Sequence, residues 1–428
     1  MQRTLLICSF LMKSSVRSKC QCAKSTRSTR KLSPLAWFND MVSHAYEYAV
    51  QAKQDGRRIV GTMCEYTPRE LILAAGAVPV CLCGGSYEMS CAAERVLPVN
   101  LCPLIKSTYG FSLEKKNPFL EMADLLVAET TCDGKKKMYE LLAKRHKMQV
   151  LELPQKPDDK DAFIHWVSEI NKLKARLESE FGIKITDNDL RSAVRQMNAE
   201  RALKRELYSL MKSDNPPLTG HDVLVMSNNL IACMPEYHAK CREIIALAKE
   251  TPCRLKNNDK TRVLLTGVPV PHGAEAVLDI IEDNGAVVVC QENCSGLKPV
   301  MEDVVEGGDV IKAIAKKYYH LPCSVMTPND DRFRLLERLV HDYRPDCIVD
   351  LVWRTCITYD VESAQVKELS GRLGLPFLKI EADYSPSDQA RLSVRLKALF
   401  ETATGRKRLS LTPAVAKRLW PGKQAQLQ

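Results

Sequence analysis

The sequence lacks the short motifs that mark the common nucleotide-binding and hydrolytic enzymes. Its 428 residues contain no Walker A loop, no GxGxxG turn, no GxSxG nucleophile elbow and no HExxH zinc motif. Each of these patterns has a defined chemical use, from binding phosphate groups to activating a serine or a water molecule. The sequence therefore shows no nucleotide site of its own.

The sequence also lacks a long apolar run. The longest one, from Leu71 to Cys83, is interrupted by Gly76 and Pro79. It is shorter than the roughly 20 apolar residues that a membrane-spanning helix needs. We therefore expect no membrane partner.

Acidic residues are missing from the first 39 positions, which contain eight Lys or Arg residues. The formal charge of the whole chain is +10, so the remainder carries only +2. A nucleic-acid-binding face needs basic residues that cluster in the folded part and, for single strands, alternate with aromatic ones. We find no such cluster and expect no nucleic-acid partner.

Residues 1–35 form a basic leader that is rich in Ser and Thr. This composition is typical of an organellar targeting peptide, and equally of a disordered tail read from an upstream start codon. Apart from such targeting we expect a cytoplasmic protein, whose folded part begins near Pro34. Cys20 and Cys22 have no partner cluster nearby, and we interpret them as incidental.

The folded part divides into three regions, because a chain of this length exceeds one ordinary core. Residues 36–160 and 256–428 alternate strand-like apolar runs with helical patterns, which predicts parallel sheets covered on both faces. Residues 161–255 have helical periodicity with dense charge and predict a helical connector. The expected fold class is α/β, with two Rossmann-like (doubly wound, parallel-sheet) domains, this connector, and the site between the domains.

Local signals predict where single elements begin. Residues 37–54 predict one continuous helix. Thr67 has the position of a helix N-cap, and Glu70 stands three residues later, as in a capping box. We expect helices to start after Cys64 and after Cys132 and to direct their positive ends at these thiols.

Six of the 17 cysteines stand where a site is expected. Each follows a strand-like run or stands beside a proline, and sites in parallel sheets form at the carboxyl ends of strands. Thiolates from separate strand ends can surround an iron–sulfur cluster. We predict that each domain supplies three thiolates to an iron–sulfur centre, in a pseudo-duplicated architecture. The six are Cys64, Cys102 and Cys132 in the first α/β region, and Cys294, Cys323 and Cys356 in the second.

Ordinary buried cysteines are the main alternative, because the free thiol is a common small core residue. Spacing alone leaves a core role and a metal role for the six equally open. Zinc favours paired C-x₂₋₄-C knuckles and a ferredoxin needs four closely spaced cysteines; the chain has no convincing set of either. Cys91 stays open, and the lone His272 favours a structural role. We expect core or surface roles for Cys81, Cys83, Cys233, Cys241, Cys253, Cys290 and Cys347.

Several longer segments resemble one enzyme superfamily. GTMCEYTPRELILAAGAVPVCLCGG, around Cys64, resembles the opening signature of the 2-hydroxyacyl-CoA dehydratase and benzoyl-CoA reductase superfamily, D-component type. KITDNDLRSAVRQMNAERALKREL, VVVCQENCSG and LPFLKIEADYSPSDQARL are similar to its later signatures. NLCPLIKSTYGF around Cys102 and PCSVMTPND around Cys323 are similar to its double-cubane cluster branch. The resemblance spans about residues 36–405.

This resemblance implies a low-potential iron–sulfur reductase of small substrates, an oxidoreductase of anaerobic metabolism. Double-cubane members hold two four-iron cubanes, joined by a sulfide, through six cysteines, and a homodimer is implied. A separate homodimeric ATPase with its own cluster is implied as the electron donor. Carried over position by position, the ligands are Cys64, Cys102, Cys132, Cys294, Cys323 and Cys356.

Other functions stay open at this point. One is a subunit of a 2-hydroxyacyl-CoA dehydratase, a lyase with a single four-iron cubane ([4Fe–4S]) held by three cysteines and with an acyl-CoA substrate. Another is a non-catalytic cluster protein that relays electrons, and a zinc-bound structural protein is a more distant alternative. The identity of the substrate and the pocket residues other than cysteine do not follow from the sequence.

Overall fold

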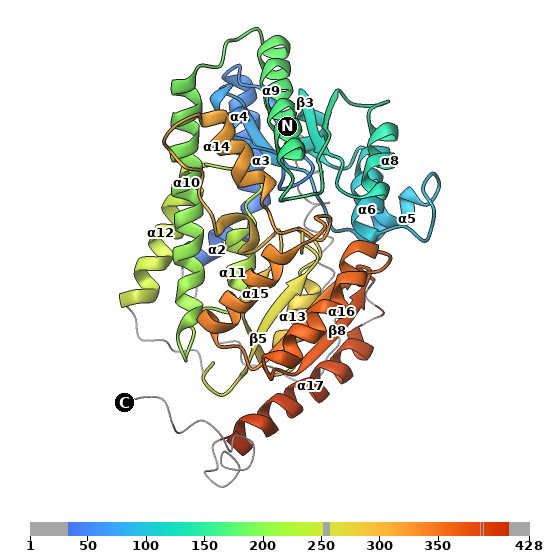
Figure 1. Ribbon diagram of the computed structural model, residues 1–428, viewed down its shortest axis with the longest axis vertical. Helices are drawn as coiled ribbons and strands as arrows, with labels where there is room; N and C mark the ends of the chain where they lie inside the picture. The colour runs from blue at the N-terminus through green and yellow to red at the C-terminus, as the bar shows by residue number, and fades with distance from the viewer. Residues whose placement is uncertain (1–32, 251–256, 386, 388, 411–428) are drawn as a thin grey trace.

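The computed structural model describes residues 33–250, 257–385, 387 and 389–410 (Figure 1). Apart from its last positions, the predicted leader with Cys20 and Cys22 lies outside these residues, and so does Cys253.

The first sheet contains four parallel strands in the order β2-β1-β3-β4. These are β1 (Ile59–Thr62), β2 (Val78–Cys81), β3 (Leu125–Glu129) and β4 (Met148–Leu151). β1 and β3 are buried along their whole length, as unbroken apolar strands in a parallel sheet are. The surrounding helices are α2 (Ser33–Asn39), α3 (Met41–Gln54), α4 (Arg69–Ala74), α5 (Tyr87–Ala93), α6 (Pro103–Glu114), α7 (Pro118–Met122) and α8 (Asp133–Leu142).

The second sheet repeats this arrangement in the C-terminal half, with the parallel order β6-β5-β7-β8. In both sheets the first strand in the sequence lies between the second and the third, so the predicted α/β class with two Rossmann-like halves is confirmed. The strands of the second sheet are β5 (Thr261–Gly267), β6 (Ala286–Glu292), β7 (Cys347–Trp353) and β8 (Phe377–Ala382). The helices of the C-terminal half are α13 (Ala276–Asp283), α14 (Val310–Tyr319), α15 (Asp330–Tyr343), α16 (Ile357–Arg372) and α17 (Gln389–Ser410).

Helices fill the part of the chain between the two sheets, as their periodicity predicted. α9 (Lys160–Phe181) and α10 (Asp187–Ser209) are the long ones, followed by α11 (Gly220–Ser227) and α12 (Pro235–Glu250). Thr186 and Thr219 each cap the helix that follows through a complete capping box, in which the threonine hydroxyl and an aspartate carboxylate satisfy two of the free N–H groups at the helix start.

Part of the C-terminal half packs into the core of the first sheet. Ile314 and Tyr319 of α14 lie in one hydrophobic cluster with Val60 and Val127 of the first sheet. The indole of Trp166, on α9, donates a hydrogen bond of 3.2 Å to the carbonyl oxygen of Ala315. Figure 1 shows α14 beside α9 and α10, in the part of the molecule that holds the first sheet. The two halves therefore share one apolar interior.

Two local predictions are wrong. The expected helix over residues 37–54 is divided at Asp40 into α2 and α3. The expected capping box at Thr67 does not form, because the Thr67 hydroxyl donates to the buried Glu129 carboxylate and Glu70 pairs with Arg201. A buried carboxylate without a hydrogen-bond donor costs more free energy than a helix start without a side-chain cap. Thr67 and Glu70 therefore bond to buried partners and do not cap the helix.

In the described part of the chain, no helix combines the length and the apolar character that crossing a membrane requires.

Gly110 sets how closely α6 can approach α5, and it offers a sharp test of this packing. A Cβ atom at Gly110 would lie 1.9 Å from the backbone oxygen of Met89, which cannot move without shifting α5. We expect Gly110→Ala to lower the free energy of unfolding by about 1–3 kcal/mol, measured by urea denaturation. Gly371 lies in α16 with nothing within 4 Å of its Cβ position, so Gly371→Ala should be neutral or stabilising by up to about 1 kcal/mol. Equal effects of the two variants would contradict the close approach of α6 to α5.

Candidate functional site

Three of the six predicted cysteines stand immediately before helices. Cys102, Cys132 and Cys356 are the residues that precede α6, α8 and α16. The neighbouring Cys356 thiol lowers the pKa of Cys102, and Cys132 interacts electrostatically with both. We call these three residues the helix-start group.

Backbone amides of the first helical turns point at the sulfur atoms of this group. The N–H of Ile105 donates a hydrogen bond of 3.0 Å to the carbonyl oxygen of Cys102. The N–H groups of Leu104, Lys135 and Tyr359 act to lower the pKa values of Cys102, Cys132 and Cys356, respectively. These are the free donors at the positive end of a helix, where a negative charge is stabilised. The prediction of a helix directly after Cys132 is confirmed. A helix also follows Cys64, as predicted, but α4 begins five residues later, at Arg69, so Cys64 is not its N-cap.

The other three predicted cysteines lie in loops. Cys64 follows β1, Cys294 follows β6, and Cys323 lies between α14 and α15. The thiol of Cys323 interacts electrostatically with those of Cys64 and Cys294, which also interact with one another. We call these three residues the loop group.

The two groups are neighbours, and each combines both halves of the chain. Cys132 of the helix-start group and Cys323 of the loop group interact electrostatically. The helix-start group contains two cysteines of the first α/β region and one of the second. The loop group contains one cysteine of the first region and two of the second. Cys132 and Cys356 follow equivalent strands of the two sheets, β3 and β7, whereas Cys64 and Cys294 follow strands that are not equivalent. The pseudo-duplication is therefore only partial at the site.

Burial keeps most of these thiols protonated in the absence of a cation. Burial raises the pKa of Cys64 to about 12, although the ammonium group of Lys135 acts in the opposite direction. Burial also raises the pKa of Cys294, against the influence of Lys298. Lys298 itself is buried and lies 2.9 Å from Glu292. The interior thus already holds two lysines beside thiols that a bound metal would deprotonate.

Buried tyrosines surround the two groups. The hydroxyl of Tyr359 lies 4.0 Å from the sulfur of Cys323 and accepts a hydrogen bond of 3.0 Å from Lys298. The hydroxyl of Tyr384 is buried near Cys102 and Cys356 and has no hydrogen-bond partner among the residues that the structure describes. A buried donor without an acceptor is costly. This one therefore suits a sulfur-rich group held by the neighbouring thiols.

The spacing of the thiols is wider than a single metal ion requires. A tetrahedral zinc ion with Zn–S bonds of about 2.3 Å keeps its sulfur ligands about 3.8 Å apart. Across residues 33–250, 257–385 and 389–410, the one set of three ligand atoms that all lie within 4.8 Å of one another belongs to Glu200, Cys233 and His238. No three of the six cysteines meet that limit. Their arrangement fits a multi-atom cluster better than it fits one ion.

A small polar pocket adjoins the loop group. Its walls include Cys294, the buried Arg201 and the buried Lys317, and its cavity volume is about 30 Å³. Burial lowers the pKa of Lys317, and the neighbouring Arg201 lowers it further. Arg201 is paired with Glu70, but no described residue forms an ion pair with Lys317. The pocket thus offers an ammonium group or a neutral amine to a polar ligand.

Sequence reasoning predicted core or surface roles for Cys81 and Cys83, and the structure places them near the site. Both are only partly buried, and Cys81 forms part of the pocket wall. A hydrogen bond from the Cys83 thiol lowers the pKa of Cys81 to about 7. Their i, i+2 spacing in a strand could have placed them on one face. His272 has the expected structural role, since its Nε2 lies 2.5 Å from the carbonyl oxygen of Asn228.

Comparisons with known proteins agree with the resemblance seen in the sequence. Residues 64–403 match the family 2-hydroxyglutaryl-CoA dehydratase, D-component. YjiM of Escherichia coli (strain K12), a protein named as a dehydratase subunit, is 38% identical over 369 residues, which cover 85% of this chain and 96% of the relative.

Two more distant relatives are a dehydratase subunit and a reductase subunit. The (R)-phenyllactyl-CoA dehydratase beta subunit of Clostridium sporogenes is 23% identical over 372 residues, covering 85% of this chain and 97% of the relative. A benzoyl-CoA reductase subunit of Thauera aromatica is 24% identical over 281 residues, covering 64% and 72%. Since these relatives are dehydratase and reductase subunits, the chain is an enzyme component of dehydratase or reductase type. It belongs to the 2-hydroxyglutaryl-CoA dehydratase D-component family.

Proposed function

We propose that this protein is a low-potential iron–sulfur reductase of small molecules. Two four-iron cubanes, joined by a sulfide, would be held by the six thiols of the helix-start group and the loop group. Such a cluster would supply electrons at very negative potential. The chain's own residues would bind the cluster, exclude water and position the substrate.

The electrostatic interactions that link the six thiols into two neighbouring groups carry this proposal. A dehydratase-type single cubane requires three thiols, so the other three would have to be ordinary core residues that happen to lie beside it. The neighbouring cations and helix starts support the proposal independently. Lys135 and Lys298 balance thiolate charge, and the amides at the starts of α6, α8 and α16 are hydrogen-bond donors for cluster or ligand sulfur.

The size of the pocket beside Cys294 supports a small substrate. Its volume of about 30 Å³ is room for a molecule of a few atoms, whereas pockets for drug-sized ligands occupy about 300–1,000 Å³. Lys317 and Arg201 on its wall would orient a polar or anionic group, and Lys317 could supply a proton to a reduced product.

A 2-hydroxyacyl-CoA dehydratase subunit is the second candidate. The names of the relatives favour it, since 85% of this chain is matched by the (R)-phenyllactyl-CoA dehydratase beta subunit. This candidate needs a partner subunit, an acyl-CoA substrate and only one cubane. For both candidates the family implies a separate ATPase that delivers electrons, and this agrees with a chain that carries no nucleotide motif. The reductase would act as a homodimer.

Iron and acid-labile sulfide, measured per chain on protein purified without oxygen, test the proposal. Two cubanes give about eight irons per chain, with sulfide slightly in excess because of the bridge. The dithionite-reduced protein should then be reoxidised by small reducible molecules, which can be followed in its absorption spectrum.

A single cubane would give about four irons per chain and would favour the dehydratase, with hydroxyacyl-CoA dehydration as the next assay. A reduced cluster that transfers its electrons only to another protein would favour an electron relay. Colourless protein with stoichiometric zinc would contradict all three functions.

A further inference from the structure

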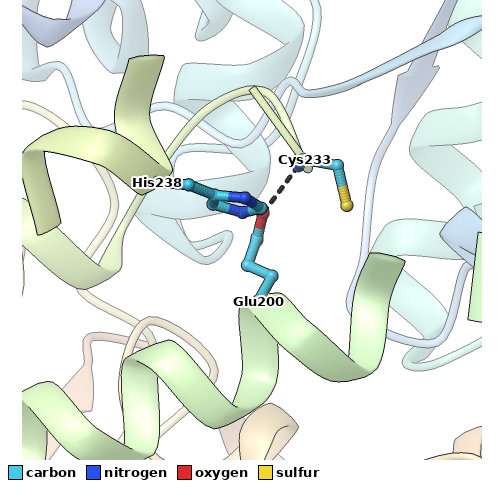
Figure 2. Close-up of side chains that lie close together, drawn as sticks. All are labelled: Glu200, Cys233 and His238. Carbon is cyan, nitrogen blue, oxygen red and sulfur yellow. Dashed lines mark hydrogen bonds and ion pairs between the residues drawn. The ribbon is translucent and has the colours of Figure 1, made fainter. Parts of the chain in front are cut away.

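A mixed cluster of metal-ligating side chains lies on α10 and at the start of α12, apart from the six cysteines. Figure 2 shows Glu200 on α10, His238 in the first turns of α12 and Cys233 in the loop before that helix. The Nε2 atom of His238 lies 3.0 Å from Oε2 of Glu200, and the ligand atoms of all three residues lie within 4.8 Å of one another. Histidine, cysteine and carboxylate are the three ligand types that zinc uses in proteins.

The distances between the ligand atoms already approach those between the ligands of a tetrahedral zinc ion. Zinc bonds of about 2.0–2.2 Å to nitrogen and oxygen keep these two atoms about 3.3 Å apart, and a bond of about 2.3 Å to sulfur places the sulfur about 3.6 Å from either. The observed spacing of 3.0 Å between His238 and Glu200 is close to this value. The Cys233 sulfur has to move inward by about 1 Å at most, which a side-chain rotation provides.

Neighbouring polar groups hold the Glu200 carboxylate in place, as such groups hold the ligating side chains of metal sites. Glu200 is only 2% exposed, and its other oxygen, Oε1, lies 3.2 Å from the amide nitrogen of Asn229 and 3.3 Å from the ammonium group of Lys204. Groups of this kind orient a ligating carboxylate, so that its second oxygen, Oε2, faces His238 and the loop of Cys233. The N–H of Cys233 donates to Oε2 of Glu200 over 2.6 Å, which fixes the loop beside the carboxylate.

The charges are compatible with a divalent ion in spite of Lys204. Cys233 loses its thiol proton on binding, and His238 binds as the neutral imidazole. One thiolate and one carboxylate then neutralise the two charges of the ion, and Lys204 remains a hydrogen-bond donor to Glu200. The sulfur of Cys233 lies 3.5 Å from the thioether sulfur of Met197 and has no stronger polar partner among the described residues.

Three protein ligands leave the fourth position of a tetrahedral ion free. Glu200 and Met197 both line the pocket of about 30 Å³ that also reaches Cys294. That space has room for a water molecule, so the pocket can supply the fourth ligand. We infer that Glu200, Cys233 and His238 form a zinc site whose open position faces the same pocket as the loop group. Its occupant would be a water molecule or an oxygen atom of a substrate.

Zinc and iron, measured together by mass spectrometry, test this inference on the full-length, anaerobically purified protein. The protein is equilibrated with Zn²⁺ and dialysed, and the wild type should retain about one zinc ion per chain. His238→Gln preserves a hydrogen bond to Glu200 but removes the imidazole, and we expect it to lose at least nine-tenths of that zinc. Cys233→Ala should lose it as well.

His221→Gln is the matched control, because His221 pairs with Asp279 and takes no part in the cluster. It should keep its zinc. Iron content should be unchanged in all variants, which separates failure of this site from failure of the iron–sulfur centre. Thermal unfolding without zinc shows whether each variant folds. With Co²⁺ as the probe, Cys233→Ala should lose the thiolate-to-cobalt absorption band. A wild type without zinc, or full zinc in both His238→Gln and Cys233→Ala, would overturn the inference.

Discussion

The Cys102→Ser/Cys356→Ser double variant is expected to retain about half of the wild-type iron, because one of two cubanes would remain. Both changes fall in the helix-start group, so the loop group stays complete. The Cys64→Ser/Cys102→Ser double variant removes one thiol from each group, and we expect it to lose nearly all of its iron. Both expectations are checked by measuring iron per chain on each variant purified without oxygen.

The two double variants separate two ways of dividing the six cysteines. If the three cysteines of each α/β region held one cubane, the pattern would reverse. Cys64→Ser/Cys102→Ser would then keep about half of the iron, and Cys102→Ser/Cys356→Ser would lose it. Cys91→Ser is the control, since Cys91 is exposed and should leave the iron content unchanged. Undiminished iron in both double variants would refute the six-thiol centre itself.

Arg332→Leu is expected to lower the free energy of unfolding by up to about 3–5 kcal/mol, the usual cost of removing one partner from a buried ion pair. Arg332 is fully buried and lies 3.1 Å from Glu292, and it also pairs with Glu362. Without the guanidinium group, the buried Glu292 keeps one cationic partner, Lys298. Urea denaturation of the two proteins measures the loss.

Arg334→Leu is the control for this change, because Arg334 lies on the same helix, α15. Its side chain is 68% exposed and pairs with Asp331 at the surface, so the midpoint of unfolding should hardly move. A similar midpoint for Arg332→Leu would show that the buried pair contributes little. Since Glu292 stands two residues before Cys294, a lower iron content in Arg332→Leu would also link this ion pair to the geometry of the loop group.

Much of the fold could be predicted from local patterns. The strands that contain Val60, Val127 and Val349 are mostly apolar and fully buried, and such strands indicate a parallel sheet with both faces covered. Proline and glycine marked the ends of several helices, as Gly76 does after α4. The strand order and the shared topology of the two halves depend on crossovers, which these local signals specify only through general rules of handedness and adjacency.

Predictions from local patterns were wrong where a side chain bonds to a residue far away in the sequence. Thr67 and Glu70 have the spacing of a capping box, but Glu129 and Arg201 engage them across the core. The same limit applies to α14, whose sequence is an ordinary amphipathic helix. Nothing within residues 310–319 indicates that it packs against the first sheet rather than the second.

The candidate site was predictable in its residue types but not in its grouping. The positions of strand ends and prolines predicted the six cysteines as candidates. Their division into two mixed groups follows from tertiary packing. The Glu200, Cys233 and His238 cluster was missed for a similar reason. Cys233 and His238 are five positions apart, a spacing that could have been noticed, but Glu200 is separated from them by more than 30 positions.

The mixed composition of the two cysteine groups also fixes the order of events during synthesis of the chain. A nascent chain that ends before Cys294 contains Cys64, Cys102 and Cys132, which belong to both groups and complete neither. Cys323 reaches the loop group only after α14 has packed against the first sheet. A cluster held by these thiols therefore cannot be inserted while the ribosome is still translating the first half. Both groups are complete only after Cys356 has been synthesised, so the thiols of the first half stay without a cluster until then.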